Sequence, residues 1–156
     1  MPERIEFVIP GVPVAQGRPK FTTVAGRGRA YDPEKSRNWK AYVRLLAARV
    51  APREPWIGPV SLEIAIWMPV PKSWSAKRRA QAVDCYHART PDADNILKGI
   101  KDALTGLIWV DDGQVADPHP VKRYGETPGC AVVITRLPGL PWEKEKEVES
   151  RHEMAR

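Results

Sequence analysis

Four aspartates flank one short amphipathic segment of the chain, and their types and spacing could support chemistry. Asp92 and Asp94 precede the segment, and Asp111 and Asp112 follow it. Carboxylate oxygens are the ligands that Mg²⁺ prefers, usually one or two carboxylates together with waters and a substrate phosphate. A metal ion held in this way can assist the hydrolysis of a phosphodiester. The two acidic pairs therefore predict a shared divalent cation and metal-assisted phosphodiester cleavage.

A structural role for the first pair is the main alternative. The apolar residues of the segment follow a helical stripe, which comprises Ile96, Leu97, Ile100, Leu104 and Leu107. Asp92 and Asp94 then lie at the start of a helix, where carboxylates cap free N–H groups and meet the positive end of the helix dipole. Capping gives no role to the second pair. Because a helix of about twelve residues spans roughly 18 Å, we expect the strands that follow to double back and bring the two pairs together.

Two other uses of a D-x-D pattern fit the sequence poorly. An EF-hand loop starting at Asp92 would need an oxygen ligand in place of Ile96, glycine in place of Leu97 and glutamate in place of Ala103. A sugar-nucleotide transferase would need a longer chain and a nucleotide-binding glycine pattern, which this sequence lacks. Both classes are therefore disfavoured.

The rest of the chain is basic, which indicates a polyanionic partner. The formal net charge is +6 over 156 residues; the segment from Glu143 onward holds five acidic and four basic residues, so residues 1–142 carry +7. A basic globular body is typical of nucleic-acid-binding proteins, although solubility alone is an alternative explanation. The two cysteines lack metal-site spacing, and no apolar run is long enough to span a membrane. We therefore expect a cytoplasmic protein that binds nucleic acid and not a membrane.

Two basic segments are candidates for contact with DNA phosphates. The first is rich in glycine and proline, is predicted to be a mobile loop, and contains Arg18, Lys20, Arg27 and Arg29. The second is predicted to be a loop leading into a short helix capped by Ser73 or Ser75, and it contains Lys72, Lys77, Arg78 and Arg79. For each segment, a solvated surface without a ligand is the alternative.

The elements that must position these residues follow from apolar periodicity. Alternation predicts strands over residues 5–9 and, most clearly, 60–68. Further short strands are expected within residues 107–112, 114–125 and 130–137. A first helix is predicted to run to about Val50, with Asp32 as its N-cap and Pro33 at its first position.

The stretch "PDADNILKGIKDALTGLIWVDDGQV" resembles the signature of the RusA family of Holliday junction resolvases, in which D-x-D-N-x-x-K is followed by D-A-L and then by W-x-D-D-x-Q. Looser similarity extends over most of residues 5–136, including "QGRPKF", "YDP" and "PVPKSWS". The resemblance implies a small single α+β domain at residues 1–137, with a mixed sheet of short strands and two main helices packed on it. Residues 138–156 are expected to form a charged tail that is either helical or disordered.

The resemblance also implies an activity and its residues. It implies a homodimeric endonuclease that resolves four-way DNA junctions by paired symmetric nicks in recombination and repair, with Mg²⁺ as cofactor and Mn²⁺ as a substitute. By motif position, Asp92, Asp94 and Asp112 match the family's essential carboxylates, and Lys98 matches its essential lysine. Asp111 is expected either to help hold the metal or to shape the turn. Lys98 is expected to contact the scissile phosphate, the alternative being a surface ion pair with Asp94.

Two alternatives to this activity stay open. A non-catalytic DNA-binding protein would use its aspartates only to cap a helix. A metal nuclease with broader substrates, such as flaps or forks, would keep the same chemistry.

Overall fold

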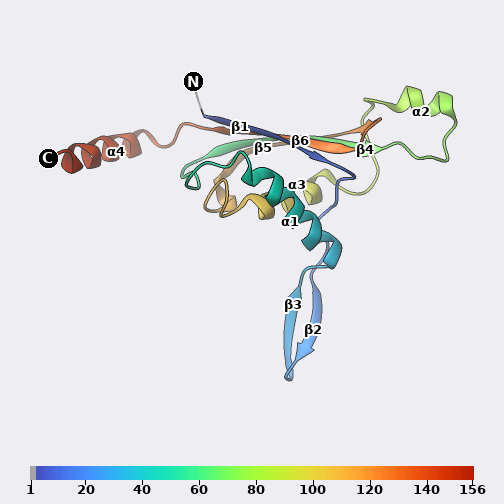
Figure 1. Ribbon diagram of the computed structural model, residues 1–156, viewed down its shortest axis with the longest axis horizontal. Coiled ribbons are helices and arrows are strands. Elements are labelled where there is room, and N and C mark those ends of the chain that lie inside the picture. Colours follow the sequence, from blue (N-terminus) through green and yellow to red (C-terminus); the bar gives the residue numbers. More distant parts are fainter. Residues whose placement is uncertain (1–2) are drawn as a thin grey trace.

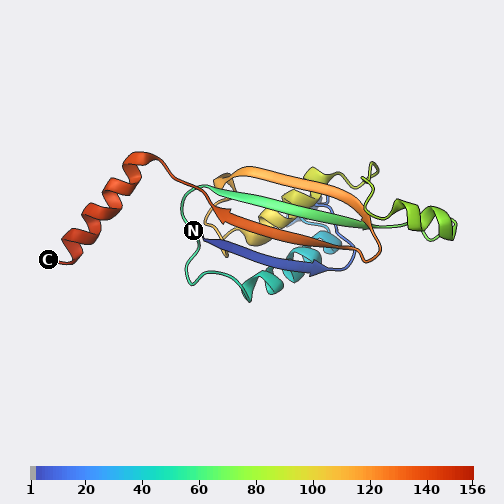
Figure 2. The same ribbon diagram turned by 90° about the horizontal axis from the view of Figure 1, so that it is seen from above.

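A four-stranded mixed sheet forms the centre of the molecule, for which the computed structural model describes residues 3–156, without the side chains of residues 24 and 144–148. The strand order is β1-β6-β4-β5 (Figure 2). The strands are β1 (Arg4–Pro10), β6 (Gly129–Arg136), β4 (Val60–Pro69) and β5 (Val115–Gly125). β6 pairs antiparallel with β1 and with β4, whereas β4 pairs parallel with β5.

Two helices, α1 (Glu34–Ala48) and α3 (Ala93–Leu104), cover one face of this sheet (Figure 1). The strand residues that face them are buried, and in β4 these are Val60, Leu62, Ile64, Ile66 and Met68. α3 contributes the buried side chains Ile96, Ile100 and Leu104 to the same core. The alternation in β4 and the helical stripe in α3 thus confirm the predicted α+β fold.

The parallel pairing of β4 with β5 requires a crossover, which residues 70–114 provide. This crossover contains the short helix α2 (Ala76–Ala82) and then α3. Pro118 and Pro120 lie within β5, at the edge of the sheet, where a residue without an N–H is tolerated. The strands predicted within residues 114–125 and 130–137 are confirmed as β5 and β6.

The segment between α3 and β5 forms a turn, so the prediction of a strand within residues 107–112 is wrong. Gly106, with φ of 81°, donates its N–H to the carbonyl of Trp109 at 2.7 Å. Trp109 is fully buried, and its ring N–H donates to Thr105 Oγ1 at 3.1 Å. The short 3₁₀ helix η1 (Asp112–Gln114) then leads into β5. Burial of the indole fixes this compact path.

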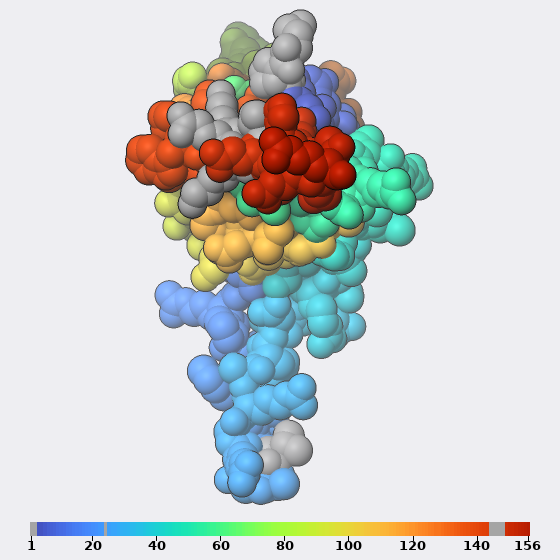
Figure 3. All heavy atoms as spheres, turned by 90° about the vertical axis from the view of Figure 1, so that its left-hand side faces the viewer, coloured from blue at the N-terminus to red at the C-terminus, as the bar shows by residue number. Residues whose placement is uncertain are grey.

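The first basic segment is a β-hairpin and not a mobile loop. Its strands β2 (Lys20–Val24) and β3 (Arg27–Tyr31) pair antiparallel. The turn residues Ala25 and Gly26 have φ of 52° and 75°, the positive values that a tight hairpin turn with the right twist requires. Figure 3 shows the hairpin projecting from the body of the molecule.

The helix starts differ from the predictions in one place. The N-cap of α1 is Pro33 without a side-chain hydrogen bond, so the expectation that Asp32 caps this helix is wrong. Ser75 does cap α2, because its Oγ accepts from Arg78 N at 3.3 Å.

Most of the charged tail forms the helix α4 (Pro141–Met154), which extends away from the sheet (Figure 1). No helix in the described part of the chain is long and apolar enough to cross a membrane.

Candidate functional site

The first acidic pair lies exposed at the start of α3. Asp92 is the N-cap residue, yet its side chain accepts no capping hydrogen bond, and Asp94 lies in the first turn. Neither carboxylate has a hydrogen bond or ion pair with any residue that the structure describes. A capping aspartate would accept from a backbone N–H of the first turn. Capping therefore does not account for Asp92, and both carboxylates remain available to a ligand.

The second acidic pair lies at η1, and its two members differ. Asp111 Oδ2 accepts from Gly113 N at 3.3 Å, while Gln114 Oε1 accepts from Asp111 N at 2.8 Å, which closes a reciprocal capping box. Gln114 also donates to the carbonyls of Trp56 and Gly58. Asp111 therefore shapes the turn. Asp112 is exposed, and its carboxylate has no partner among the described residues.

The two acidic pairs lie at opposite ends of α3. Asp92 follows Pro91, whose carbonyl accepts from Lys122 Nζ, late in β5. Asp112 instead lies three residues before the first residue of β5, Val115. From Val115 to Lys122 a strand advances roughly 23 Å, and α3 itself spans roughly 18 Å. The expectation that one chain folds back to unite the two pairs is therefore wrong, since the helix and strand between them are both extended.

The separation of the two acidic pairs determines how many carboxylates one chain can offer to a single divalent cation. Among the described residues, no group of three or more His, Cys, Asp or Glu side chains is placed to hold a metal ion. Mg²⁺ often uses only one or two protein carboxylates, with waters and substrate phosphate completing its shell. Each end of α3 supplies carboxylates of the right chemistry, but a single chain does not gather the predicted set.

Lys98 lies on the exposed side of α3, one turn after Asp94. The alternative predicted for it, a surface ion pair with Asp94, is not formed in the described structure. Its ammonium therefore has no carboxylate partner among the described residues and lies one helical turn from the first acidic pair.

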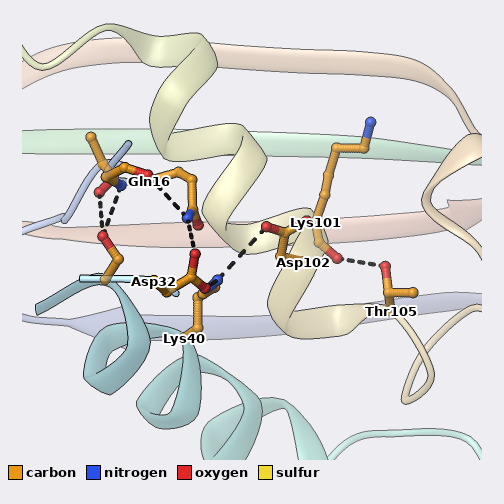
Figure 4. Close-up of polar contacts among 9 residues, drawn as sticks. Gln16, Asp32, Lys40, Lys101, Asp102 and Thr105 are labelled. Carbon is orange, nitrogen blue, oxygen red and sulfur yellow. Dashed lines mark hydrogen bonds and ion pairs between the residues drawn. The ribbon is translucent and has the colours of Figure 1, made fainter. Parts of the chain in front are cut away.

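A polar network joins the base of the hairpin to α1 and α3 (Figure 4). Gln16 Nε2 donates to Asp32 Oδ1 at 3.1 Å, and Lys40 forms an ion pair with the same carboxylate. Lys40 Nζ also lies 3.8 Å from Asp102 Oδ2 on α3. The hydrogen bond from Lys40 is the main reason why the pKa of Asp32 is held below its usual value. Asp32 thus anchors the hairpin and does not cap the helix.

The backbone beside this network ties the hairpin to the first turn of α3. Gln16 N donates to the carbonyl of Asn95 at 2.9 Å, and Gly17 N donates to the buried Ser36 Oγ at 2.8 Å. A Cβ at Gly17 would lie 2.8 Å from Ser36 Oγ and from Pro33 Cγ, so only glycine fits there without a shift. No role was predicted from the sequence for Gln16, Ser36 or Lys40. The only available signal was their presence in and near "QGRPKF" and "YDP".

The predicted DNA-binding residues form two separate exposed groups. In the hairpin, Lys20 lies opposite Tyr31, Thr22 opposite Arg29 and Val24 opposite Arg27, so the three basic residues share one face. Arg18 lies just before this hairpin, and the second group is on or next to α2. The two groups project from different parts of the molecule (Figure 1). The start of α3 is connected to both, through Gln16 to the hairpin and along residues 83–92 to α2.

Comparison with known proteins confirms the resemblance seen in the motifs. A family model described as "Endodeoxyribonuclease RusA" matches residues 10–135. A protein of Bacillus subtilis (strain 168) described as "Uncharacterized protein YqaN" is 41% identical over 137 residues, which cover 85% of this chain and 96% of that protein. The family match includes the hairpin, both acidic pairs and the whole crossover, and it ends before α4.

The ion pair at Asp32 makes the stability of the fold pH-dependent. Because the folded-state pKa of Asp32 is lowered, its stabilisation is complete above the unfolded-state pKa, about 3.9, and is lost as the pH falls through the folded value. Asp32→Asn should lower the unfolding free energy at about pH 7 by under about 1 kcal/mol, since the pair is partly exposed. Urea unfolding measures this difference. Its persistence at about pH 2 would contradict the assignment.

Proposed function

Because the chain belongs to the RusA family of endodeoxyribonucleases, we propose that it resolves four-way DNA junctions by paired symmetric cleavage of phosphodiesters, in DNA recombination and repair. The family acts on junction DNA. The observation that carries the proposal for this chain is that Asp92, Asp94 and Asp112 are exposed and have no partners among the described residues, at the motif positions of the family's essential carboxylates. Exposed basic groups on both sides of α3 are suited to hold DNA phosphates.

We propose Mg²⁺ as the cofactor, with Mn²⁺ as a substitute, because nucleases of this family generally depend on a divalent metal. Asp92 and Asp94 at the start of one α3 would hold it together with Asp112 from a second copy of the chain. When bound beside a phosphate, such an ion polarises the phosphoryl oxygen and lowers the pKa of bound water. The free ammonium of Lys98 would contact the same phosphate and offset charge that develops in the transition state.

We further propose that the protein acts as a homodimer in which each site draws on both chains. The two acidic pairs lie at opposite ends of α3, too far apart to meet within one chain. A two-fold axis relates the same surfaces of two subunits reciprocally, so the start of one α3 can meet the η1 of its partner twice in one dimer. Such an arrangement also supplies the two sites that paired cuts require.

Two other activities compete with this proposal. A non-catalytic DNA-binding protein would bind junctions without cutting them, and a broader nuclease would also cut flaps or forks. A plasmid that extrudes a cruciform separates the first competitor, because linearisation should occur in Mg²⁺ and not in EDTA. Labelled flap, fork and four-way substrates of matched sequence separate the second.

Replacing one carboxylate tests the metal role against the capping role. Asparagine caps a helix about as well as aspartate, so Asp94→Asn should fold normally but lose Mg²⁺-dependent nicking. Its affinity for junction DNA in EDTA should be equal or higher, because a negative charge near the phosphates is removed. Gel shifts in EDTA, cleavage in Mg²⁺ and thermal melting measure these three properties.

The matched control for that experiment is Asp84→Asn. Asp84 is exposed and has a φ of 66°, a conformation that asparagine also tolerates. This variant should cut at the parental rate. A folded Asp94→Asn that also cuts at the parental rate would overturn the metal assignment.

Mixed dimers test whether the site is shared between chains. Co-expression of differently tagged Asp94→Asn and Asp112→Asn chains yields heterodimers. If each site is built from both chains, one site of the heterodimer contains both substitutions and the other contains neither. These heterodimers should nick one strand of a junction, whereas each parental homodimer should be inactive. Denaturing gels of the cleaved strands measure this. Heterodimers as inactive as the parents would show that each chain uses its own pairs.

The basic hairpin should set the salt dependence of binding. Replacement of Arg18, Lys20, Arg27 and Arg29 by alanine should weaken binding to junction and duplex DNA alike. Each lost phosphate contact should lower the slope of log affinity against log salt by roughly 0.9. Fluorescence anisotropy at several salt concentrations measures the slope, with Arg53→Ala as an exposed control outside the hairpin. An unchanged slope would exclude the hairpin from the interface.

A further inference from the structure

An open, shallow cavity lies on the surface beside α2, away from the acidic pairs. It has a volume of about 350 Å³ and is lined by Trp74, Arg78, Gln81, Ala82 and Arg89. Cavities from about 300 Å³ upward hold small organic groups in many proteins. The lining combines one aromatic ring, two guanidinium groups and one amide, and it contains no carboxylate.

Trp74 is held as a fixed platform in this cavity. It is half-buried, and its backbone N–H donates to the carbonyl of Pro71 at 3.2 Å. Its ring packs 5.5 Å from that of Tyr124, which in turn packs 4.6 Å from His87. An aromatic side chain that is held in place and partly exposed is suited to stacking, because every nucleobase has a π-face.

The two arginines give the cavity its charge. Arg78 and Arg89 are exposed, and neither forms an ion pair in the part of the chain that the structure describes. The guanidinium carbon of Arg89 lies 5.5 Å from the centre of the Trp74 ring. A guanidinium group binds phosphate oxygens in a planar fork and also stacks on aromatic planes. An aromatic ring that shares a pocket with two guanidinium groups matches a nucleotide, with its base on the ring and its phosphates on the arginines.

The cavity is linked rigidly to the first acidic pair. Lys122 Nζ donates to the carbonyls of both Arg89 and Pro91, which fixes this segment against β5. The N–H of His87 also donates to the carbonyl of Lys122 at 3.0 Å. Arg89 precedes Asp92 by three residues, so their Cα atoms are separated by roughly 10 Å at most. In duplex DNA this distance corresponds to about three nucleotides along one strand.

We propose that this cavity binds one unstacked nucleobase of the DNA, within about three nucleotides of the phosphate beside Asp92. Trp74 stacks on the base, and Arg78 and Arg89 contact the phosphates on either side of it. Gln81 offers an amide donor and acceptor to the edge of the base, so the cavity favours certain bases at that position. This inference rests on the proposed function, because the proposed cut defines where the base lies.

Abasic substitution in the DNA tests the proposal. The probes are synthetic four-way junctions, each with a single abasic site at one position close to the cut, and fluorescence anisotropy in EDTA gives their affinities. The wild-type protein should lose roughly 5- to 100-fold in affinity at one position only, the size expected for one stacked base. Trp74→Ala should show that loss already on the intact junction, with no further loss at the same abasic position.

Two further variants keep this test decisive. Because Trp74 packs on Tyr124, its removal could also loosen the fold, whereas Ala82→Leu fills the cavity without removing any contact and should reproduce the same pattern. Trp142→Ala, which changes an exposed tryptophan in α4, should behave as wild type. The inference would be overturned if no abasic position lowered the affinity of the wild-type protein. It would also be overturned if Trp74→Ala and Ala82→Leu still lost as much affinity at the sensitive position as the wild type does. A wild-type protein that binds junctions no better than duplex would instead overturn the proposed function.

Discussion

The burial of one face of α3 is the constraint on which the candidate site depends. Ile96, Ile100 and Leu104 are completely buried against the sheet and α1, and each such burial stabilises the fold by about 1.5–3 kcal/mol. A rotation of the helix about its axis would expose these side chains, so the opposite face must stay in solvent. That face carries Asp94 and Lys98. The hydrophobic core thus determines which charged groups a DNA phosphate can reach.

Both ends of α3 are also fixed by contacts to other elements. At its start, the backbone of Gln16 binds the carbonyl of Asn95. At its end, Arg44 Nη1 donates to the carbonyls of Ala103 and Thr105 at 3.1 and 3.0 Å, which satisfies acceptors that a helix end leaves free. The length of the helix is therefore a fixed spacer. Each end presents acid in a defined place, and neither end alone carries the full motif.

The periodicity of the sequence predicted correctly those features that depend on residues within a single helix or strand. The stripe of α3, the alternation of β4 and the Ser75 cap of α2 each follow from residues within one element, and the structure confirms them. The path of the chain between elements depends on long-range contacts and was predicted less well. Asp32 and Pro33 have the local signature of a helix start. The carboxylate of Asp32 instead forms an ion pair with Lys40 and accepts a hydrogen bond from Gln16. Likewise, the motif identified the four aspartates, whereas their separation depends on the paths of α3 and β5 and does not follow from the motif.

The parallel pairing of β4 with β5 has a consequence for how the site is acquired during folding. All candidate acidic residues, Lys98 and the aromatic cavity lie in the crossover of residues 70–114 or at its end. A long crossover must close before the parallel strands can pair, and such non-local closure is slow compared with local contacts. The chain therefore gains its surface for DNA cleavage only when the sheet is complete. A partly folded chain, even one that already contains the hairpin and α1, would have no assembled site with which to damage DNA.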